Sequence, residues 1–252
     1  MATDTAAAAA AAALLEARRS RNWLEALPEG AQPASMEDVF AIHALVAEAL
    51  GPIAGFKVGA ASPTADPSGA PLHERNLRFD ATPYAAADFN ITRIEAEIGY
   101  RLGADLPPRE APYSREEVLD AIESLHPTIE IVDTRFVSLG RDPLSHTADQ
   151  ASHGALVVGP AVMDWRHIDP PALPVKLTFN DRVVVEQVGG NSAGEPIRLI
   201  QWLANKGAHR YGGLKAGMVI TTGSCTGMPA VEAGSRVRAE FAGVGAVETA
   251  IL

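Results

Sequence analysis

The spacing of apolar residues changes along the chain, from helical near the N-terminus to strand-like after residue 55. Apolar residues three or four positions apart predict helices, and Ser35 and Gly51-Pro52 supply a cap and a stop for one of them. The segments predicted as helices are 14–26, 37–50, 114–126 and 194–209. We expect the two N-terminal helices to pack on the outside of the domain that follows.

Alternating apolar and polar residues predict short strands in most of the remaining chain, most clearly in RIEAEIGYRL, residues 93–102. The segments predicted as strands are 55–59, 93–102, 128–136, 154–159, 175–180, 182–188, 218–223, 236–241 and 247–252. Residues 61–90 are rich in Pro, Ala, Asp and Gly and are predicted to be an irregular loop. This pattern predicts a β-rich α+β fold, with a helical segment at 1–54 and one structural unit at 55–252.

Composition and charge narrow the function classes. The 252 residues are 47% apolar and 21% charged, and the formal net charge of −10 argues against binding to a nucleic-acid backbone. No apolar run approaches the ~18 residues of a membrane span. The single Cys225 excludes an internal disulfide and a cysteine metal cage. No Lys or Arg precedes the alanine run at 6–13, which therefore favours a helix over a signal peptide and the cytoplasm as the compartment.

The triplet Glu95-Ala96-Glu97 places two carboxylates on one face of a predicted strand, because side chains alternate faces along a strand. Glu130 shares a face with Thr128 and Val132 on another predicted strand. Carboxylates this close repel one another unless protons or a cation compensate, and Mg²⁺ prefers oxygen ligands. A solvent-facing strand surface explains the same pattern, and from the pattern alone it is the commoner case.

Lys57 lies between apolar residues in GFKVG, a predicted strand. Partial burial would lower the pKa of its ammonium group and suit it to proton transfer. The alternative is a strand lysine whose charged head reaches water.

The run Gly190–Gly194 matches G-x-S-x-G, the nucleophile elbow of serine hydrolases, with Ser192 as the nucleophile. That fold places an acid and then a histidine after the serine. No aspartate follows Asp181, and His209 is the only later histidine. A loop and helix entry is therefore the favoured explanation, and a serine esterase is a rival function.

Five segments, in order along the chain, together resemble the fumarylacetoacetate hydrolase superfamily, and most closely its branch of 2-keto-4-pentenoate (2-hydroxypentadienoate) hydratases and 4-oxalocrotonate decarboxylases. They are GFKVGAAS, RIEAEIGYRLGADLP, HPTIEIVDTRF, ADQASHGALVVG and WLANKGAHRYGGLKAGMVITTGSCTGMPAVEAG. The resemblance implies a mixed β-roll or barrel with metal and substrate in its mouth. It also makes 55–252 the catalytic domain.

The same resemblance implies the site residues. Glu95, Glu97 and Glu130 would hold Mg²⁺ or Mn²⁺, and Lys57 would move protons. The substrate-binding positions that it implies are Ser62, Gln150, Ser152, Ser224 and Thr226, with Gln150 standing where the family usually has Asn.

The chain departs from the family pattern at two places. Hydratases carry a Pro-Asp-Phe-Gly-like stretch whose Asp is proposed to transfer a proton, and this chain has PLHERNLRFD there. His73 or Glu74 would then be the catalytic replacement, and Asp80 would match a later, structural Asp. His153 fills a position that is usually small or Cys. The His73-Glu74 pair lacks the spacing of the hydrolase branch, which argues against carbon–carbon hydrolysis.

The resemblance implies a metal-dependent hydratase of aromatic hydrocarbon catabolism, which adds water to a 2-hydroxy-2,4-dienoate or 2-keto-4-enoate to give a 4-hydroxy-2-keto acid. The alternatives are a 4-oxalocrotonate-type decarboxylase and a non-catalytic homologue that acts as a binding partner. The expected partner is a small 2-keto acid, with no nucleic acid and no membrane. A homo-oligomer is also expected, and a complex with a pathway enzyme is left open.

Overall fold

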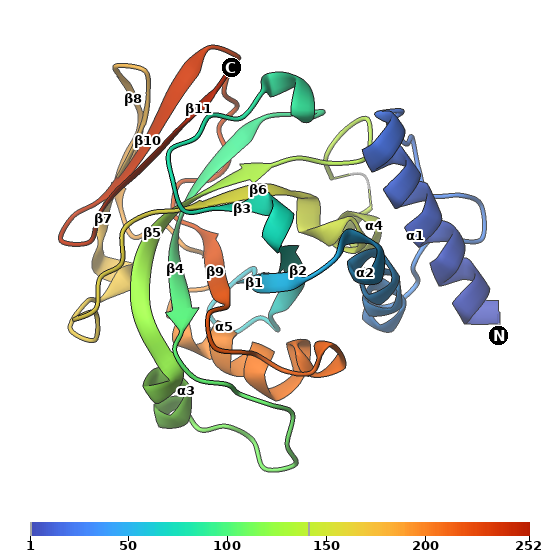
Figure 1. The fold of residues 1–252 in the computed structure, drawn as a ribbon, viewed down its shortest axis with the longest axis horizontal. Coiled ribbons are helices and arrows are strands. Elements are labelled where there is room, and N and C mark those ends of the chain that lie inside the picture. Colours follow the sequence, from blue (N-terminus) through green and yellow to red (C-terminus); the bar gives the residue numbers. More distant parts are fainter. Residues whose placement is uncertain (1, 141) are drawn as a thin grey trace.

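Two β-sheets and a group of helices at one side make up the computed structural model, which describes residues 2–140 and 142–252, with side chains from residue 5 onward (Figure 1). The helices are α1 (Ala2–Ser20), α2 (Met36–Leu50), α3 (Arg115–Ala121), α4 (Pro143–Ala148) and α5 (Ile197–Trp202), which continues as a π-helical turn, Leu203–Gly207. The strands are β1 (Ile53–Gly59), β2 (Ser68–His73), β3 (Leu77–Arg78), β4 (Arg93–Leu102), β5 (Ile122–Val132), β6 (His153–Val158), β7 (Pro174–Phe179), β8 (Arg182–Val188), β9 (Val219–Ser224), β10 (Ser235–Phe241) and β11 (Gly245–Ile251).

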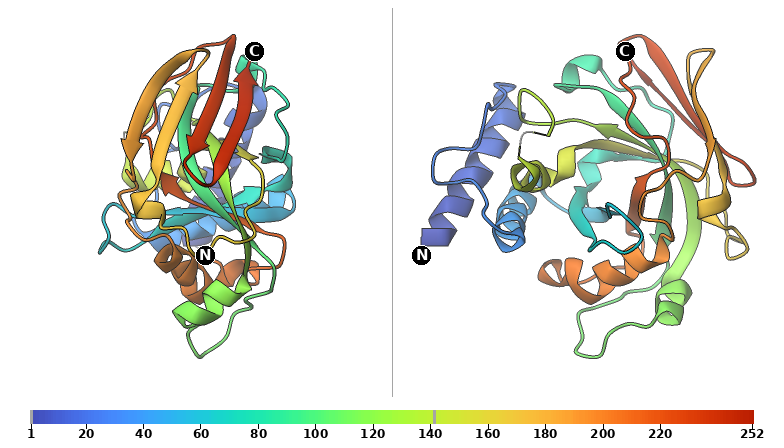
Figure 2. Two further views of the ribbon diagram at one scale, coloured as in Figure 1. Left: turned by 90° about the vertical axis from the view of Figure 1, so that its left-hand side faces the viewer. Right: turned by 180° about the vertical axis from the view of Figure 1, so that it is seen from behind.

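The larger sheet has seven strands in the order β2-β1-β9-β4-β5-β6-β3, and the smaller has four in the order β11-β10-β7-β8. β1 pairs with β9 and β3 with β6 in parallel, whereas the other pairs are antiparallel, so the larger sheet is mixed. The larger sheet curls into a half-barrel that the smaller sheet adjoins (Figures 1 and 2). This confirms the predicted α+β fold.

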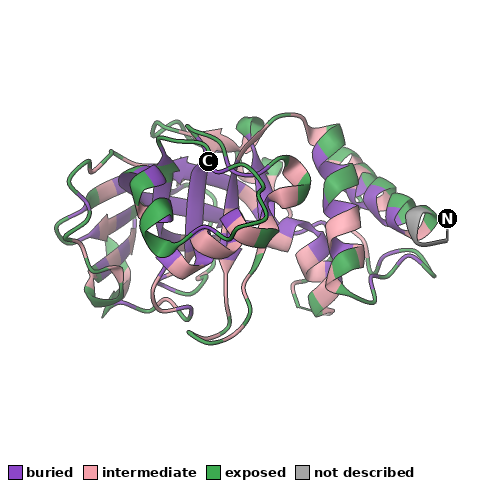
Figure 3. Cartoon of the chain, turned by 90° about the horizontal axis from the view of Figure 1, so that it is seen from below, coloured by how far each residue is buried: buried purple, intermediate pink, exposed green. Residues whose placement is uncertain are grey.

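The N-terminal helices form an apolar cluster of their own beside the sheets. Leu14 of α1 and Ile42 of α2 pack with Phe136 and Ala148, away from the main core between the sheets. Figure 3 shows that the central strands are largely buried and that α1 alternates buried and exposed positions. The helices therefore pack outside the sheets, as expected, and the boundary at 54/55 stays a prediction.

Three predictions differ clearly from the structure. The helix predicted at 14–26 ends at Ser20, because Arg21 adopts a left-handed φ of 60° and Leu24 forms a bridge with Phe136. The helix predicted at 114–126 ends at Ala121, because the residues from Ile122 onward pair with β4.

The third error lies in the predicted loop at 61–90, which contains β2 and β3. β2 includes Gly69 and Pro71, both poor strand formers, and it lies at the edge of the sheet, where the missing N–H of a proline is tolerated. The helix predicted at 37–50 is confirmed, with Ser35 as its N-cap and Gly51 as its C-cap.

Among the described residues, Cys225 is buried and free, and no helix has the length and apolar content to cross a bilayer.

Two glycines flank Lys57 in β1 and differ sharply in their surroundings. A Cβ on Gly55 would lie 1.9 Å from the carbonyl oxygen of Val219 in β9, whereas a Cβ on Gly59 would meet no atom within 4 Å. We predict that Gly55→Ala lowers the free energy of unfolding by about 3 kcal/mol, because β1 and β9 must separate. The control Gly59→Ala should change it by less than about 0.5 kcal/mol. Urea unfolding measures both, and equal stability of the two variants would contradict this reading of the β1–β9 contact.

Candidate metal centre

Strand register brings the three predicted carboxylates together. Glu95 of β4 lies directly opposite Glu130 of β5, and Glu97 lies two residues further along the same face of β4. One carboxylate oxygen from each residue lies within 4.8 Å of the others. The convergence expected from the family resemblance is therefore present in the fold.

Burial makes this cluster electrostatically costly. Glu97 and Glu130 are 1% and 0% exposed, and Glu95 is half-buried. Burial, and then the charge of Glu130, raises the pKa of Glu95 to about 7 and raises the pKa of Glu97 well above its usual value. Burial also acts to raise the pKa of Glu130, but Lys57 and His153 more than offset it, so the pKa of Glu130 is lowered. Lys57 also acts to lower the pKa of Glu95 and Glu97, but too weakly to offset burial and repulsion.

Neighbouring groups fix the carboxylates at particular oxygens. Thr221 Oγ1 and the Gly223 N–H, the latter at 2.8 Å, both donate to Glu97 Oε2. Lys57 Nζ and His153 Nδ1 lie 2.5 Å and 3.0 Å from Glu130 Oε1. Glu130 Oε2 is buried and has no hydrogen-bond partner among the described residues.

The donor set fits a hard divalent cation. All three ligands are carboxylate oxygens, and the orphaned Glu130 Oε2 costs free energy unless a further partner meets it. Mg²⁺ and Mn²⁺ are cations that such oxygen ligands suit. The residues present therefore fit the predicted metal.

Lys57 extends from β1 to the carboxylates and also donates to the Ala151 carbonyl oxygen at 3.0 Å. Burial alone would lower its pKa, but Glu130, Glu95 and Glu97 outweigh burial and raise the pKa. The prediction of a lowered pKa is therefore wrong for this arrangement, because the sequence did not show how close three acids lie. Lys57 is a cation in this site and holds a proton.

A strained turn supplies the carbonyl that Lys57 binds. Gln150, Ala151 and Ser152 have successive left-handed φ angles of 49°, 48° and 56°, which non-glycine residues rarely adopt. Arg135 braces the turn from behind, donating to the carbonyl oxygens of Asp149 at 2.9 Å and His153 at 3.0 Å. The strained backbone is therefore the segment that contacts Lys57, through the carbonyl oxygen of Ala151.

A cavity of about 230 Å³ adjoins the carboxylates and contains one of the five predicted substrate-binding residues. Its lining includes Lys57, Glu95, Ser152, His146 and Met228. Ser152 Oγ is hydrogen-bonded to His146 Nδ1 at 2.9 Å. No pattern in the sequence marked His146 or Met228, since each comes from a loop or short helix that only the fold brings to the site.

The other four predicted substrate-binding residues do not line this cavity. Gln150 accepts from Arg18 at 2.9 Å on the far side of the turn. Ser62 Oγ accepts from the Ala65 N–H, within its own loop. Thr226 Oγ1 accepts from the Ala96 N–H at 3.0 Å, and Ser224 Oγ donates to the Gly227 carbonyl oxygen. All four side chains make hydrogen bonds within the protein. Their substrate-binding roles stay predictions.

His73 and Glu74 lie apart from the cavity. His73 is buried at the end of β2, three residues past the partner of Lys57, and its Nδ1 is hydrogen-bonded to the Gly51 carbonyl oxygen at 2.9 Å. Three strand residues span about 10 Å. Glu74 is exposed in the turn that follows. Their catalytic roles stay predictions that this placement does not support.

Ser192 does not have the partners of a nucleophile elbow. Its hydroxyl donates to the Ala60 carbonyl oxygen at 2.8 Å, and no histidine contacts it among the residues described. The run at 190–194 is a loop that precedes α5, as favoured from the sequence.

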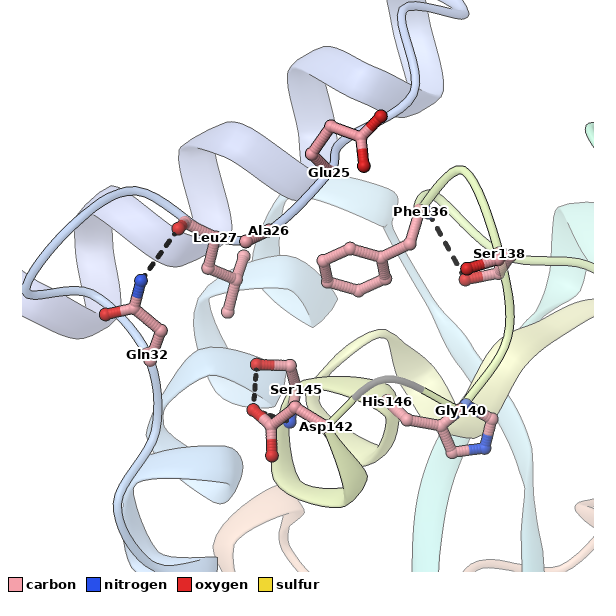
Figure 4. Close-up of a pocket in the computed structure, with 11 residues that line it drawn as sticks. Glu25, Ala26, Leu27, Gln32, Phe136, Ser138, Gly140, Asp142, Ser145 and His146 are labelled. Atoms are coloured by element: carbon pink, nitrogen blue, oxygen red, sulfur yellow. Dashed lines mark hydrogen bonds between the residues drawn. The ribbon is translucent and has the colours of Figure 1, made fainter.

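A second, smaller cavity of about 90 Å³ lies between the linker after α1 and the loop after β5 (Figure 4). Leu27 and Phe136 line it on one side, and Asp142 and Ser145 on the other. His146 also lines it, but none of the three glutamates does. This cavity is separate from the candidate metal centre.

Similarity to known proteins shows the family to which the chain belongs. Residues 74–252 match the model of the fumarylacetoacetate (FAA) hydrolase C-terminal domain. The chain belongs to the fumarylacetoacetate hydrolase family. It is 31% identical over 248 residues to the 2-hydroxyhexa-2,4-dienoate hydratase of Comamonas testosteroni, covering 92% of each chain.

A further hydratase relative matches over a shorter region. The chain is 31% identical over 157 residues to the 2-keto-4-pentenoate hydratase of Paraburkholderia xenovorans, and the match spans 62% of this chain and 58% of that relative. Among solved structures, the 4-oxalocrotonate decarboxylase from Pseudomonas putida G7, complexed with magnesium and adipate, superimposes with a TM-score of 0.85. That protein is 24% identical, and the match covers 98% of this chain and 97% of that one. The fold expected from the family resemblance is confirmed.

His153 is a positioning residue whose contribution to the metal centre is measurable. His153→Leu removes the hydrogen bond to Glu130 Oε1, whereas His153→Asn keeps a donor near the position of Nδ1. We predict that the leucine variant binds Mg²⁺ about tenfold or more weakly, because groups that orient a ligand tune its affinity, and that the asparagine variant recovers much of the loss. Calorimetric titration measures both. Wild-type Mg²⁺ affinity in the leucine variant would show that His153 does not position Glu130.

Proposed function

We propose that this protein is a metal-dependent hydratase that adds water to a 2-hydroxy-2,4-dienoate or 2-keto-4-enoate and gives a 4-hydroxy-2-keto acid. The observation that carries the proposal is the cluster of Glu95, Glu97 and Glu130 beside a lysine and a cavity. Relatives named as hydratases support the substrate class.

Metal binding, proton transfer and orientation of the substrate would fall to different residues of the site. Glu95, Glu97 and Glu130 would hold Mg²⁺ or Mn²⁺, which when bound supplies positive charge that stabilises an enolate next to a carboxylate. Lys57 Nζ carries a proton at the cavity wall and is placed to give it to a substrate carbon and to receive one back. The hydrogen-bonded pair Ser152 and His146 lies on the same wall and would orient the substrate or water.

A 4-oxalocrotonate-type decarboxylase is the second candidate, because the superimposable structure carries that name, as does a relative from Pseudomonas putida that is 30% identical over 155 residues. Loss of CO₂ from a vinylogous β-keto acid passes through a similar dienolate, so the same charged groups serve both reactions. The two differ in the product, and release of CO₂ from 4-oxalocrotonate distinguishes them. A non-catalytic homologue would convert neither compound.

The remaining proposals rest on the sequence pattern and on the family resemblance. These are a cytoplasmic homo-oligomer, a complex with a pathway enzyme, substrate contacts from Ser62, Gln150, Ser224 and Thr226, and a proton-transfer role for His73 or Glu74.

Two variants separate metal binding from proton transfer. We predict that Glu97→Gln weakens Mg²⁺ binding and lowers turnover of 2-hydroxypenta-2,4-dienoate by about a hundredfold or more, since it removes one charged ligand. Lys57→Met should still bind Mg²⁺, because it keeps all three carboxylate ligands, and should lower the single-turnover rate by about 10²-fold or more. The exposed Glu186→Gln is the control for a lost carboxylate elsewhere.

Loss of the dienol absorbance and calorimetric Mg²⁺ titration are the two measurements for these variants. Undiminished Mg²⁺ affinity in Glu97→Gln would remove the metal site, and an unchanged single-turnover rate in Lys57→Met would remove the proton shuttle.

Cation binding should release protons. Burial raises the pKa of Glu95 to about 7 and raises that of Glu97 well above its usual value, so the pair is partly protonated near neutral pH when no cation is bound, whereas a cation needs carboxylates. Mg²⁺ affinity should therefore rise as the pH increases from about 6 to about 8. Calorimetry in two buffers of different ionisation enthalpy counts the protons. An affinity independent of pH, with no proton release, would refute the raised pKa values.

A further inference from the structure

A third cavity, of about 350 Å³, lies at the other edge of the large sheet and is lined by arginines. They come from the C-terminal end of α1 and the residue after it, the turn before β3, β3 itself, and the segment after β5. The five arginines are Arg18, Arg21, Arg75, Arg78 and Arg135. This cavity and the cavity beside the metal centre share no lining residue. A local excess of arginine is unexpected in a chain with a net charge of −10.

Carboxylates neutralise only part of this charge. The two acids of the lining are Asp88, which pairs with Arg21 at 3.1 Å, and Asp133, which lies 3.6 Å from Arg135. Arg135 also pairs with the buried Asp149. Two of the five guanidinium groups are thus compensated.

The other three arginines have no carboxylate partner among the described residues. Arg18 donates to the neutral Gln150 side chain, and Arg78 donates to the carbonyl oxygens of Thr82 and Pro83. Arg75 makes no hydrogen bond or ion pair with any described residue. Burial, followed by the charge of Arg135, lowers the pKa of Arg18, while Asp149 and Asp133 act in the opposite direction. The five guanidinium groups exceed the three carboxylates Asp88, Asp133 and Asp149 by two charges, and this local positive charge favours an anion in the cavity.

The cavity also has features of a built site for an organic molecule. Trp23, Tyr84 and Phe89 form apolar walls, and the Arg78 guanidinium stacks over the Tyr84 ring at 3.7 Å. Tyr84 is 6% exposed, yet its hydroxyl has no hydrogen-bond partner in the described part of the chain, and the same holds for Asn76 Nδ2. Two unpartnered donors beside three unpaired guanidinium groups match the acceptors of a small dianion.

We propose that this cavity binds a small dianion, a dicarboxylate or a phosphate, at a site separate from the metal centre. Arg18, Arg75 and Arg78 supply the charge, and the planar guanidinium groups suit the paired oxygens of a carboxylate or phosphate. The site lies behind the strained turn, because Arg18 holds Gln150 and Arg135 holds the backbone on both sides of that turn.

Calorimetric titration of the full-length chain without added metal tests the proposal, with inorganic phosphate in one arm and succinate in the other. The wild type should bind one of them saturably, and the preferred arm identifies the source of the anion. Arg75→Gln should weaken binding about tenfold, as expected for one lost charge-assisted contact. The variant should fold normally, since the Arg75 side chain is exposed and makes no hydrogen bond or ion pair with a described residue.

Arg182→Gln is the matched control, because Arg182 is an exposed arginine on β8 that likewise has no side-chain partner among the described residues. It should leave the affinity unchanged, and so should Glu97→Gln in the metal centre. Absence of saturable binding in both arms would overturn the proposal. Equal affinity of wild type and Arg75→Gln would also overturn it, since the anion would then bind elsewhere.

Discussion

Mutual repulsion among Glu95, Glu97 and Glu130 is the interaction on which the rest of the site depends. Two unit charges about 4 Å apart interact by about 4 kcal/mol at an effective dielectric constant of about 20, and two of these carboxylates are buried. Lys57 and His153 both contact Glu130 Oε1, and Lys57 also attracts Glu95 and Glu97, but for these two burial and repulsion outweigh that attraction. Glu95 and Glu97 must therefore bind protons or share a cation, which is why the pKa of each is raised.

Several elements of the large sheet converge to hold this unfavourable cluster in place. β4 and β5 supply the carboxylates, β9 supplies donors to Glu97, and β1 supplies Lys57. The left-handed turn at 150–152 adds the carbonyl that fixes the lysine. Because β1 and β9 pack too closely for a side chain at Gly55, a small change in that contact would move the ammonium group relative to Glu130. The strained turn and the close contact between β1 and β9 together fix the position of the Lys57 ammonium group.

The sequence predicted the elements that carry the carboxylates, and it predicted less about what surrounds them. The alternation around Glu95 and Glu97 marked β4, and that strand is confirmed residue by residue. Whether Glu130 would face the pair depended on the register of two strands, which only the resemblance implied. β2 was not predicted, because Gly69 and Pro71 are poor strand formers. The start of β5 was predicted as a helix, because the local spacing of apolar residues is helical. Lys57 was placed correctly in a strand, but its pKa depends on acids distant in sequence.

The most direct test of the central claim is the location of a cation in a crystal grown with Mn²⁺, followed by anomalous scattering. We predict one strong anomalous peak that lies about 2.0–2.3 Å from an oxygen of each of Glu95, Glu97 and Glu130. Absence of a peak between these side chains, with the carboxylates turned toward solvent or paired through protons, would contradict it.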